Sequence, residues 1–266
     1  MENKLTTLLN GMDALICGST SGIGLSCARE FALSGANVTL FSRNKEKLQQ
    51  AVSMLDTSNN QKHQYLIGDF NFPEEIKKTI TLHINSGNKF HILVNNSGGP
   101  NGGKIINAKT SEFIETFNRH LICNHILVKS LLPQMIGLNY GRIINIISTS
   151  VKEPISGLGV SNTIRAAVAS WAKTLSKEIM QDGITINNIL PGYTNTERLS
   201  SIIESKSQSS NRSIEEISDA LKNQVPLKRF GKPTEIAKAV SFIASPSAAY
   251  INGISLAVDG GRINSI

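Results

Sequence analysis

The sequence has few of the features that mark membrane, disulfide-rich or nucleic-acid-binding proteins. No run of about eighteen apolar residues occurs in its 266 residues, so we expect no membrane-spanning helix and no membrane partner. Its three cysteines, Cys17, Cys27 and Cys123, form no CxxC pair, which predicts reduced thiols and a cytoplasmic location. The first ten residues do not resemble a signal peptide.

Two further absences limit the ligands. Aromatic residues make up only 5% and the basic residues form no run, so we expect no nucleic-acid partner despite a net charge of +7. The histidines and cysteines show no metal-ligand spacing, and we expect no metal site. The positive charge suits a phosphorylated cofactor or an acidic carrier protein, and equally suits solubility alone.

Short apolar runs alternate with helical patterns along the chain. Most runs are continuous, which is typical of strands in a parallel sheet that is covered on both faces. The predicted strands are Asp13–Cys17, Asn37–Phe41, His63–Ile67, His91–Asn95, Arg142–Ile147, Thr185–Leu190 and Ile254–Val258. The predicted helices are Gly22–Leu33, Lys45–Leu55, Pro73–Ile84, Ser111–Gly137, Ser161–Met180 and Pro233–Ala244. We therefore expect an α/β fold, a Rossmann-type doubly wound domain of residues 1–266 with a seven-stranded, mainly parallel sheet and helices on both faces.

The segment Tyr193–Gln224 interrupts this alternation. It is rich in serine, asparagine and charged residues, and it follows a predicted strand. Two interpretations are open: a substrate lid at about residues 193–224, or a mobile surface loop.

A glycine-rich turn, Gly18-Ser19-Thr20-Ser21-Gly22-Ile23-Gly24, follows the first predicted strand and opens the first helix. Glycines there permit a tight turn, a close approach of the backbone to a pyrophosphate, and close packing of helix on strand. The helix N-terminus offers N–H groups to phosphate. Ser42 and Arg43 end the second strand, where an acidic residue would bind the ribose hydroxyl of NAD. Arg43 suits a 2′-phosphate instead, so we expect NADP(H) rather than NAD(H), unless Arg43 is an ordinary surface residue.

Further motifs follow in order: Asp69-Phe70, Asn95-Asn96-Ser97-Gly98, Gly141–Ser148, Pro191-Gly192-Tyr193-Thr194 and Val258–Gly261. Together with the turn, they resemble the short-chain dehydrogenases/reductases over nearly the whole chain. The resemblance implies a catalytic serine at Ser148 and a homodimer or homotetramer. It also implies cofactor contacts at Asp69, Phe70, Asn95, Ser97, Gly98, Pro191, Gly192 and Thr194.

The catalytic positions depart from the family pattern. The family's tyrosine, about thirteen residues after the serine, corresponds to Ser161, and its lysine corresponds to Arg165. Its asparagine corresponds to His120, or to Asn124 if the register shifts. The chain thus looks similar to a divergent group of 3-oxoacyl-acyl-carrier-protein reductases with SNxxR in place of YxxxK.

Three functions remain open. The first is an NADP(H)-dependent reductase of a carbonyl substrate, small or linked to an acyl carrier, in which Tyr193 or else His120 donates the proton and Arg165 holds the ribose. A carrier protein would dock at the basic residues Arg142, Lys228, Arg229 or Lys232. The second is a cofactor-binding pseudo-enzyme or interaction module, with Ser161 as a helix N-cap or small packing residue and His120 as a hydrogen-bonded core histidine. The third is a non-redox dehydration or isomerisation, with Ser148 and Arg165 stabilising an oxyanion.

Overall fold

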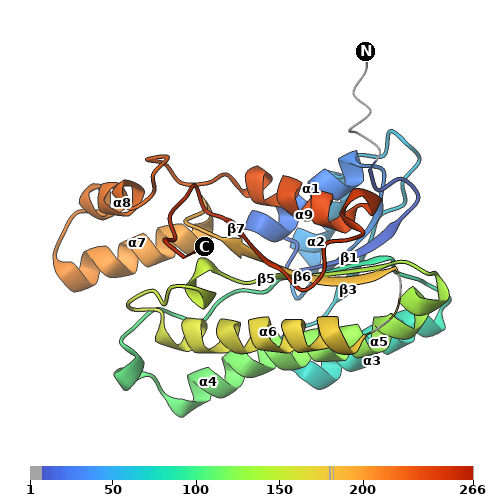
Figure 1. Ribbon diagram of the computed structural model, residues 1–266, viewed down its shortest axis with the longest axis horizontal. Coiled ribbons are helices and arrows are strands. Elements are labelled where there is room, and N and C mark those ends of the chain that lie inside the picture. Colours follow the sequence, from blue (N-terminus) through green and yellow to red (C-terminus); the bar gives the residue numbers. More distant parts are fainter. Residues whose placement is uncertain (1–7, 180, 182, 266) are drawn as a thin grey trace.

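A seven-stranded, entirely parallel sheet forms the centre of the molecule (Figure 1). The computed structural model describes residues 8–179, 181 and 183–265. The strand order is β3-β2-β1-β4-β5-β6-β7. The strands are β1 (Asp13–Cys17), β2 (Asn37–Ser42), β3 (Gln64–Ile67), β4 (Ile92–Asn95), β5 (Gly141–Ile146), β6 (Ile184–Pro191) and β7 (Ser255–Val258). The predicted fold class is confirmed, and no predicted strand end is shifted by more than one residue.

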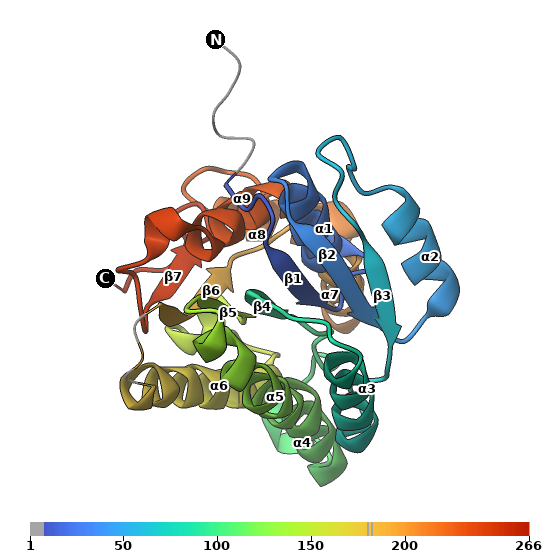
Figure 2. The same ribbon diagram turned by 90° about the vertical axis from the view of Figure 1, so that its right-hand side faces the viewer.

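Helices cover both faces of the sheet (Figure 2). In β1, Ala14 and Ile16 pack into one core, while Leu15 and Cys17 pack into the other, because successive side chains of a strand point to opposite faces. The first core lies under α1 (Gly22–Leu33), α2 (Lys45–Ser53) and α9 (Pro233–Ala244). The second lies under α3 (Pro73–Asn85), α5 (Cys123–Gly137) and α6 (Gly159–Glu178). None of the described helices is long and apolar enough to cross a membrane.

The predicted helix Ser111–Gly137 is interrupted in the structure. It consists of α4 (Thr110–Phe117), a π-helical turn (Asn118–Ile122) and α5. The predicted helix is therefore present, but it contains a π turn that the sequence does not indicate, because a π turn adds a residue to the helical repeat without a break in the apolar pattern. His120 lies in this turn and is buried. The predicted end of the next helix, Met180, is outside the described residues, as is the chain start up to Thr7.

Residues 193–224 do not form a mobile surface loop, and that interpretation was wrong. Most of the segment forms α7 (Glu197–Ser210) and α8 (Ile214–Asn223), which lie beyond one end of the sheet (Figure 1). The Ser213 hydroxyl accepts from Glu216 N, and the Glu216 carboxylate accepts from Ser213 N, which makes a capping box for α8. The function of this segment as a lid stays a prediction.

The sheet order creates a crevice at the carboxyl ends of β1 and β4. From β1 the chain continues to β2 and β3 on one side, and it then returns to β4 on the other side of β1. Ligands of doubly wound sheets bind at this point of reversal, outside the carboxyl ends of the strands.

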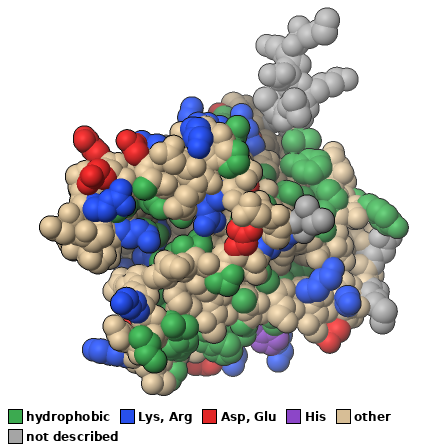
Figure 3. Space-filling model, turned by 60° about the vertical axis from the view of Figure 1, so that its left-hand side comes forward, with side chains coloured by type: hydrophobic (Ala, Val, Ile, Leu, Met, Phe, Trp, Pro, Cys, Tyr) green, Lys and Arg blue, Asp and Glu red, His purple; other side chains and the backbone are tan. Residues whose placement is uncertain are grey.

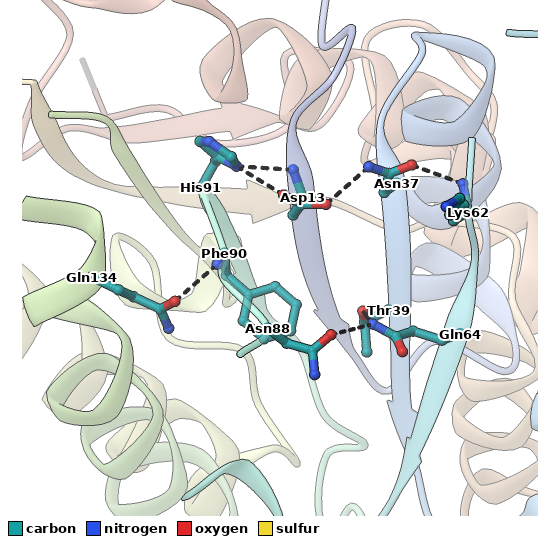
Figure 4. Close-up of polar contacts among 9 residues, drawn as sticks. All are labelled: Asp13, Asn37, Thr39, Lys62, Gln64, Asn88, Phe90, His91 and Gln134. Atoms are coloured by element: carbon teal, nitrogen blue, oxygen red, sulfur yellow. Dashed lines mark hydrogen bonds and ion pairs between the residues drawn. The ribbon is translucent and has the colours of Figure 1, made fainter. Parts of the chain in front are cut away.

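At the other end of the sheet, side chains near the amino-terminal ends of the strands form hydrogen bonds with one another (Figure 4). Asn37 Nδ2 donates to Asp13 Oδ1 at 2.9 Å, and Lys62 N donates to Asn37 Oδ1 at 2.8 Å. Asp13 N donates to His91 Nδ1 at 3.0 Å. These polar groups bond to one another, so we assign them to the stability of the sheet and not to a ligand.

Arg142, predicted to contact a carrier protein, belongs to the interior. Its side chain is 2% exposed, its Nη1 donates to Gly183 O at 2.7 Å, and its guanidinium lies 4.2 Å from the centre of the Tyr140 ring. That prediction was wrong because the Arg142 side chain is buried against Tyr140 and the turn before β6. Lys228, Arg229 and Lys232 are exposed.

Candidate active site

The glycine-rich turn is held at the crevice by Asn96. Gly18 and Gly22 have φ values of +56° and +53°, in the left-handed region that glycine tolerates. A β-carbon on Gly24 would lie 2.2 Å from Gly18 O, so α1 packs on the turn only with glycine there. Asn96 Nδ2 donates to Cys17 O at 3.2 Å and to Gly18 O at 3.1 Å. The turn thus presents the N-terminus of α1 to the crevice, an arrangement that suits a pyrophosphate.

Hydroxyl groups fasten the turn to β2. Ser19 Oγ accepts from Phe41 N at 3.1 Å, and Thr20 Oγ1 lies 3.5 Å from Ser42 Oγ. Cys17, where the family usually has threonine, is buried, and burial raises the pKa of its thiol. The bonds from Asn96 secure the turn beside this cysteine. No role for Asn96 followed from the sequence motif alone, because its contact with Gly18 crosses 78 residues and depends on the pairing of β1 with β4.

A second depression lies at the carboxyl ends of β2 and β3. Arg43, Gly68, Asp69 and Glu75 are among its lining residues. The Arg43 side chain is 71% exposed, and its Nη1 lies 3.4 Å from Asp69 Oδ2. Phe70, predicted to contact adenine, is buried with its ring 5.3 Å from that of Phe41. The open Arg43 guanidinium is therefore the group here that is placed to meet a phosphate.

The main cavity joins the turn to the predicted catalytic residues. Its volume is about 370 Å³. The predicted site residues that line it are Gly18, Ser21, Gly22, Ile23, Ser97, Gly98, Ser148, Ser161, Arg165, Pro191, Gly192, Tyr193 and Thr194. Asn95 does not line it. Asn95 is buried within the sheet, where its Nδ2 donates to Asn145 Oδ1 at 2.9 Å.

Ser161 and Arg165, which the sequence predicts in place of YxxxK, are bonded to each other, and Arg165 is also bonded to the end of β5. Arg165 Nε donates to Ser161 Oγ at 3.2 Å, and Arg165 Nη1 donates to Ile146 O at 3.1 Å and Ile147 O at 3.0 Å. Ser148 Oγ accepts from Ser150 N at 3.1 Å. Burial, followed by the charge of Arg198, lowers the pKa of Arg165 to about 10. The guanidinium is thus a fixed cation in the cavity at neutral pH.

His120 is a buried neutral imidazole behind the cavity. Its side chain is 4% exposed, and its Nδ1 lies 2.8 Å from Ser97 Oγ. Burial lowers its pKa well below the usual value, and the cations Arg165, Arg119 and Arg198 lower it further. Among the described residues, its Nε2 has no hydrogen-bond partner. His120 reaches the site through Ser97 and is not a lining residue.

Tyr193 lines the cavity but is also anchored to α8. Its hydroxyl donates to Gln224 Oε1 at 3.1 Å. The Arg262 guanidinium lies 4.6 Å from the centre of its ring, and the Phe230 ring packs edge-on at 6.3 Å. The Tyr193 hydroxyl is therefore held by a hydrogen bond to the residue that follows α8.

Two arginines without an assigned role in the sequence also reach this region. Arg198, in the first turn of α7, donates from Nη2 to Pro100 O. Arg119, in the π turn, donates from Nη1 to Gly98 O at 3.2 Å and from Nη2 to Asn71 Oδ1 at 2.6 Å. The contacts of both arginines depend on tertiary structure. In the sequence, only the position of Arg198 shortly after the Pro191–Thr194 motif indicates that it lies near the site. Within the described part of the chain, no group of three or more His, Cys, Asp or Glu side chains is placed to hold a metal ion.

Comparisons with known proteins identify the family of this chain. A family model described as Enoyl-(Acyl carrier protein) reductase matches residues 18–262. The chain is 32% identical over 257 residues to the 3-oxoacyl-(acyl-carrier-protein) reductase of Rickettsia prowazekii, with 96% of this chain and 98% of that protein covered.

Two solved structures have closely similar folds. One is L-sorbose reductase from Gluconobacter frateurii complexed with NADPH and L-sorbose, with a TM-score of 0.90, 27% identity, and 98% and 100% of the two chains covered. The other is a variant of the actinorhodin polyketide ketoreductase with NADPH, with a TM-score of 0.87, 28% identity, and 96% and 98% coverage. The chain therefore belongs to the short-chain dehydrogenase/reductase family, among its members that resemble 3-oxoacyl-acyl-carrier-protein reductases.

Proposed function

We propose that this protein is an NADP(H)-dependent reductase of carbonyl substrates that uses an atypical proton donor. The observation that carries the proposal is the single cavity that extends from the glycine-rich turn to Ser148, Ser161 and Arg165. Such a cavity brings a cofactor-binding element and candidate polarising groups to one place. The names of its relatives, 3-oxoacyl reductase and sorbose reductase, support carbonyl reduction, and the solved neighbours with NADPH support the cofactor.

The residues present fit the cofactor. The N-terminus of α1 and the turn Gly18–Gly24 would hold the pyrophosphate, and a β-carbon on Gly98 would meet no atom within 4 Å, so that the backbone there is open to a ligand. Arg43 would hold the 2′-phosphate, because its guanidinium is exposed and its ion pair with Asp69 is long, at 3.4 Å. When bound, NADP(H) supplies the hydride.

The chain's own groups would orient the substrate and stabilise charge. The Ser148 hydroxyl oxygen accepts from Ser150 N, so its proton is available to a carbonyl oxygen in the cavity. The Arg165 cation, fixed by the carbonyl oxygens of Ile146 and Ile147, stabilises negative charge that develops on the substrate's carbonyl oxygen. The proton comes from Tyr193, the only phenol among the lining residues of the described chain. Ser161, bonded to Arg165, helps to position the cation.

Calorimetric titration with NADPH and, separately, NADH tests the cofactor assignment. We expect tight binding of NADPH and weak binding of NADH. Arg43→Ala should weaken NADPH binding by roughly ten- to a hundredfold, the loss expected for charge-assisted hydrogen bonds, and leave NADH binding unchanged. Arg29→Ala, at an exposed arginine on α1, is the matched control and should bind both as the wild type does.

Turnover is then measured as NADPH oxidation with a panel of ketones, 3-oxo esters, oxo acids and a 3-oxoacyl thioester. Substrate-dependent oxidation supports the proposal. Tight NADPH binding without oxidation by any compound would instead indicate a cofactor-binding module. Product formation without any change in NADPH would indicate dehydration or isomerisation.

A further inference from the structure

Two guanidinium groups from different helices lie close to Gly99 in the lining of the main cavity. A β-carbon built on Gly99 would lie 3.5 Å from Arg165 Nη2 of α6 and 3.5 Å from Arg198 Nη2 of α7. The two nitrogens are therefore separated by no more than twice that distance. Because Gly99 has no side chain, the space beside both nitrogens stays open to a ligand.

The structure shows no counter-ion for these groups. Arg165 uses Nε for Ser161 Oγ and Nη1 for the carbonyl oxygens of Ile146 and Ile147. Arg198 Nη2 donates to the carbonyl oxygen of Pro100. All of these acceptors are uncharged, and neither guanidinium is part of an ion pair with any residue that the structure describes.

The cavity as a whole is basic. Its charged lining residues in the described chain are Arg165, Arg198 and Lys206 against the single acid Glu197. Figure 3, which brings the α7–α8 end of the molecule forward, shows both Lys and Arg side chains and Asp and Glu side chains on this face. Arg165 and Arg198 are both partly buried, and the charge of Arg198 contributes to the lowered pKa of Arg165. Two like charges held close in a partly buried site repel each other, and an anion between them removes this repulsion.

We propose that Arg165 and Arg198 together bind a carboxylate of the substrate, so that the enzyme acts on oxo acids in preference to neutral carbonyl compounds. This inference rests on the proposed function. Guanidinium N–H groups bind carboxylate oxygens at about 2.7–2.9 Å, so one carboxylate can accept a hydrogen bond from each arginine across the gap above Gly99. Ser148 lines the same cavity, so the carbonyl group beside that carboxylate would lie within the catalytic site.

The proposal is tested by binding, without turnover. Protein saturated with NADP⁺ is titrated calorimetrically with pyruvate, acetoacetate and phenylpyruvate and with the methyl ester of each acid. We expect at least one acid to bind roughly ten- to a hundredfold more tightly than its ester, the range for charge-assisted hydrogen bonds. Arg198→Gln should remove this preference. Arg212→Gln, an exposed arginine between α7 and α8, is the matched control and should retain it.

Equal binding of each acid and its ester would overturn the proposal, and so would a preference that survives in Arg198→Gln. Weaker NADPH binding by Arg198→Gln with no change in acid preference would also overturn it, since the arginine would then hold the cofactor. Failure of the proposed function would be distinguishable from failure of this inference, because the protein would then not bind NADPH. In that case the same titrations on the cofactor-free protein, with the same two variants, still decide whether the arginine pair binds carboxylates.

Discussion

Arg165 donates a hydrogen bond from Nε to the Ser161 hydroxyl oxygen at 3.2 Å across one turn of α6. The sequence predicts these two residues at the family's tyrosine and lysine positions, and this contact joins them. A serine hydroxyl is a weaker acid than a phenol and is shorter, so it does not replace the tyrosine as a proton donor. The pair places a cation in the cavity that Ser148 also lines.

Ser161→Ala tests this positioning role. Arg165 keeps its two bonds to the carbonyl oxygens of Ile146 and Ile147, so the guanidinium should stay in place. We expect kcat in the NADPH oxidation assay to fall by less than about tenfold, because the charged guanidinium loses one hydrogen bond and keeps the other two in place. A fall of about a thousandfold would show that the Ser161 hydroxyl itself transfers the proton.

Tyr193→Phe tests the proposed proton donor. If the phenol supplies the proton, kcat should fall by roughly 10²–10⁴-fold while the Kd for NADPH is unchanged. The measurements are initial rates with a saturating substrate and calorimetry with NADPH. Tyr140→Phe is the matched control, because that hydroxyl donates to Ala244 O away from the cavity, and kcat should not change.

A structural role of the same hydroxyl can be separated from the chemical one. Tyr193 Oη also donates to Gln224 Oε1, and Phe removes that bond as well. Gln224→Ala removes the bond but keeps the phenol, so it should retain kcat within about threefold for the loss of one exposed hydrogen bond. Equal losses in the two variants would show that the anchoring of α8, and not proton donation, accounts for the effect.

Gly24→Ala tests the glycine-rich turn. The new β-carbon would lie 2.2 Å from Gly18 O and 2.7 Å from Asn96 Nδ2, so the turn or α1 must shift. We expect the free energy of unfolding in urea to fall by about 1–3 kcal/mol or more, with loss of NADPH binding. Gly137→Ala, at the end of α5 with nothing within 4 Å of the new atom, should instead raise it by up to about 1 kcal/mol. Similar results for the two variants would contradict this packing argument.

The sequence predicts most of the fold because its signals there are local. Continuous apolar runs mark buried parallel strands, and every predicted strand is present. The segment that was predicted least well, residues 193–224, is polar in composition, although the spacing of Ile214, Ile217 and Leu221 and the Ser213–Glu216 capping box predict a helix. The polar composition of this segment favoured a loop, although the spacing of its few apolar residues is that of a helix. The π turn at Asn118–Ile122 could not be predicted, because one added residue does not alter the apolar character of the helix.

The candidate site shows the same division. The turn Gly18–Gly24 is contiguous in sequence, and its strand–turn–helix context was readable. Arg198 reaches Pro100 across 98 residues, and its approach to Arg165 depends on where the first turn of α7 lies relative to the segment after β4. Asn95, part of a recognisable motif, bonds to Asn145 within the sheet and does not face the cavity. A motif thus names the residues of a site more reliably than it assigns their contacts.

The π turn also has a consequence for stability at acid pH, because it buries His120. In the folded protein the pKa of His120 lies well below its usual value, through burial and then through Arg165, Arg119 and Arg198. In the unfolded chain it titrates near about 6.5. The contribution of this histidine to stability is therefore complete above about pH 6.5 and is lost as the pH falls below that value, because the unfolded state then takes up a proton that the folded state does not.

His120→Asn should remove this dependence. Between about pH 6.5 and 5 the wild type should lose stability up to about 1.4 kcal/mol per pH unit more steeply than the variant, the slope for one proton. The measurement is the free energy of unfolding in urea at a series of pH values. The variant should be less stable at pH 8 because it loses the bond to Ser97, and this constant difference is distinguished from the change of stability with pH. His125→Asn, on the exposed side of α5, leaves His120 in place and should keep the wild-type slope. Parallel curves for the wild type and His120→Asn would show that the imidazole is protonated in the folded protein, and the neutral buried histidine inferred from its three arginine neighbours would be wrong.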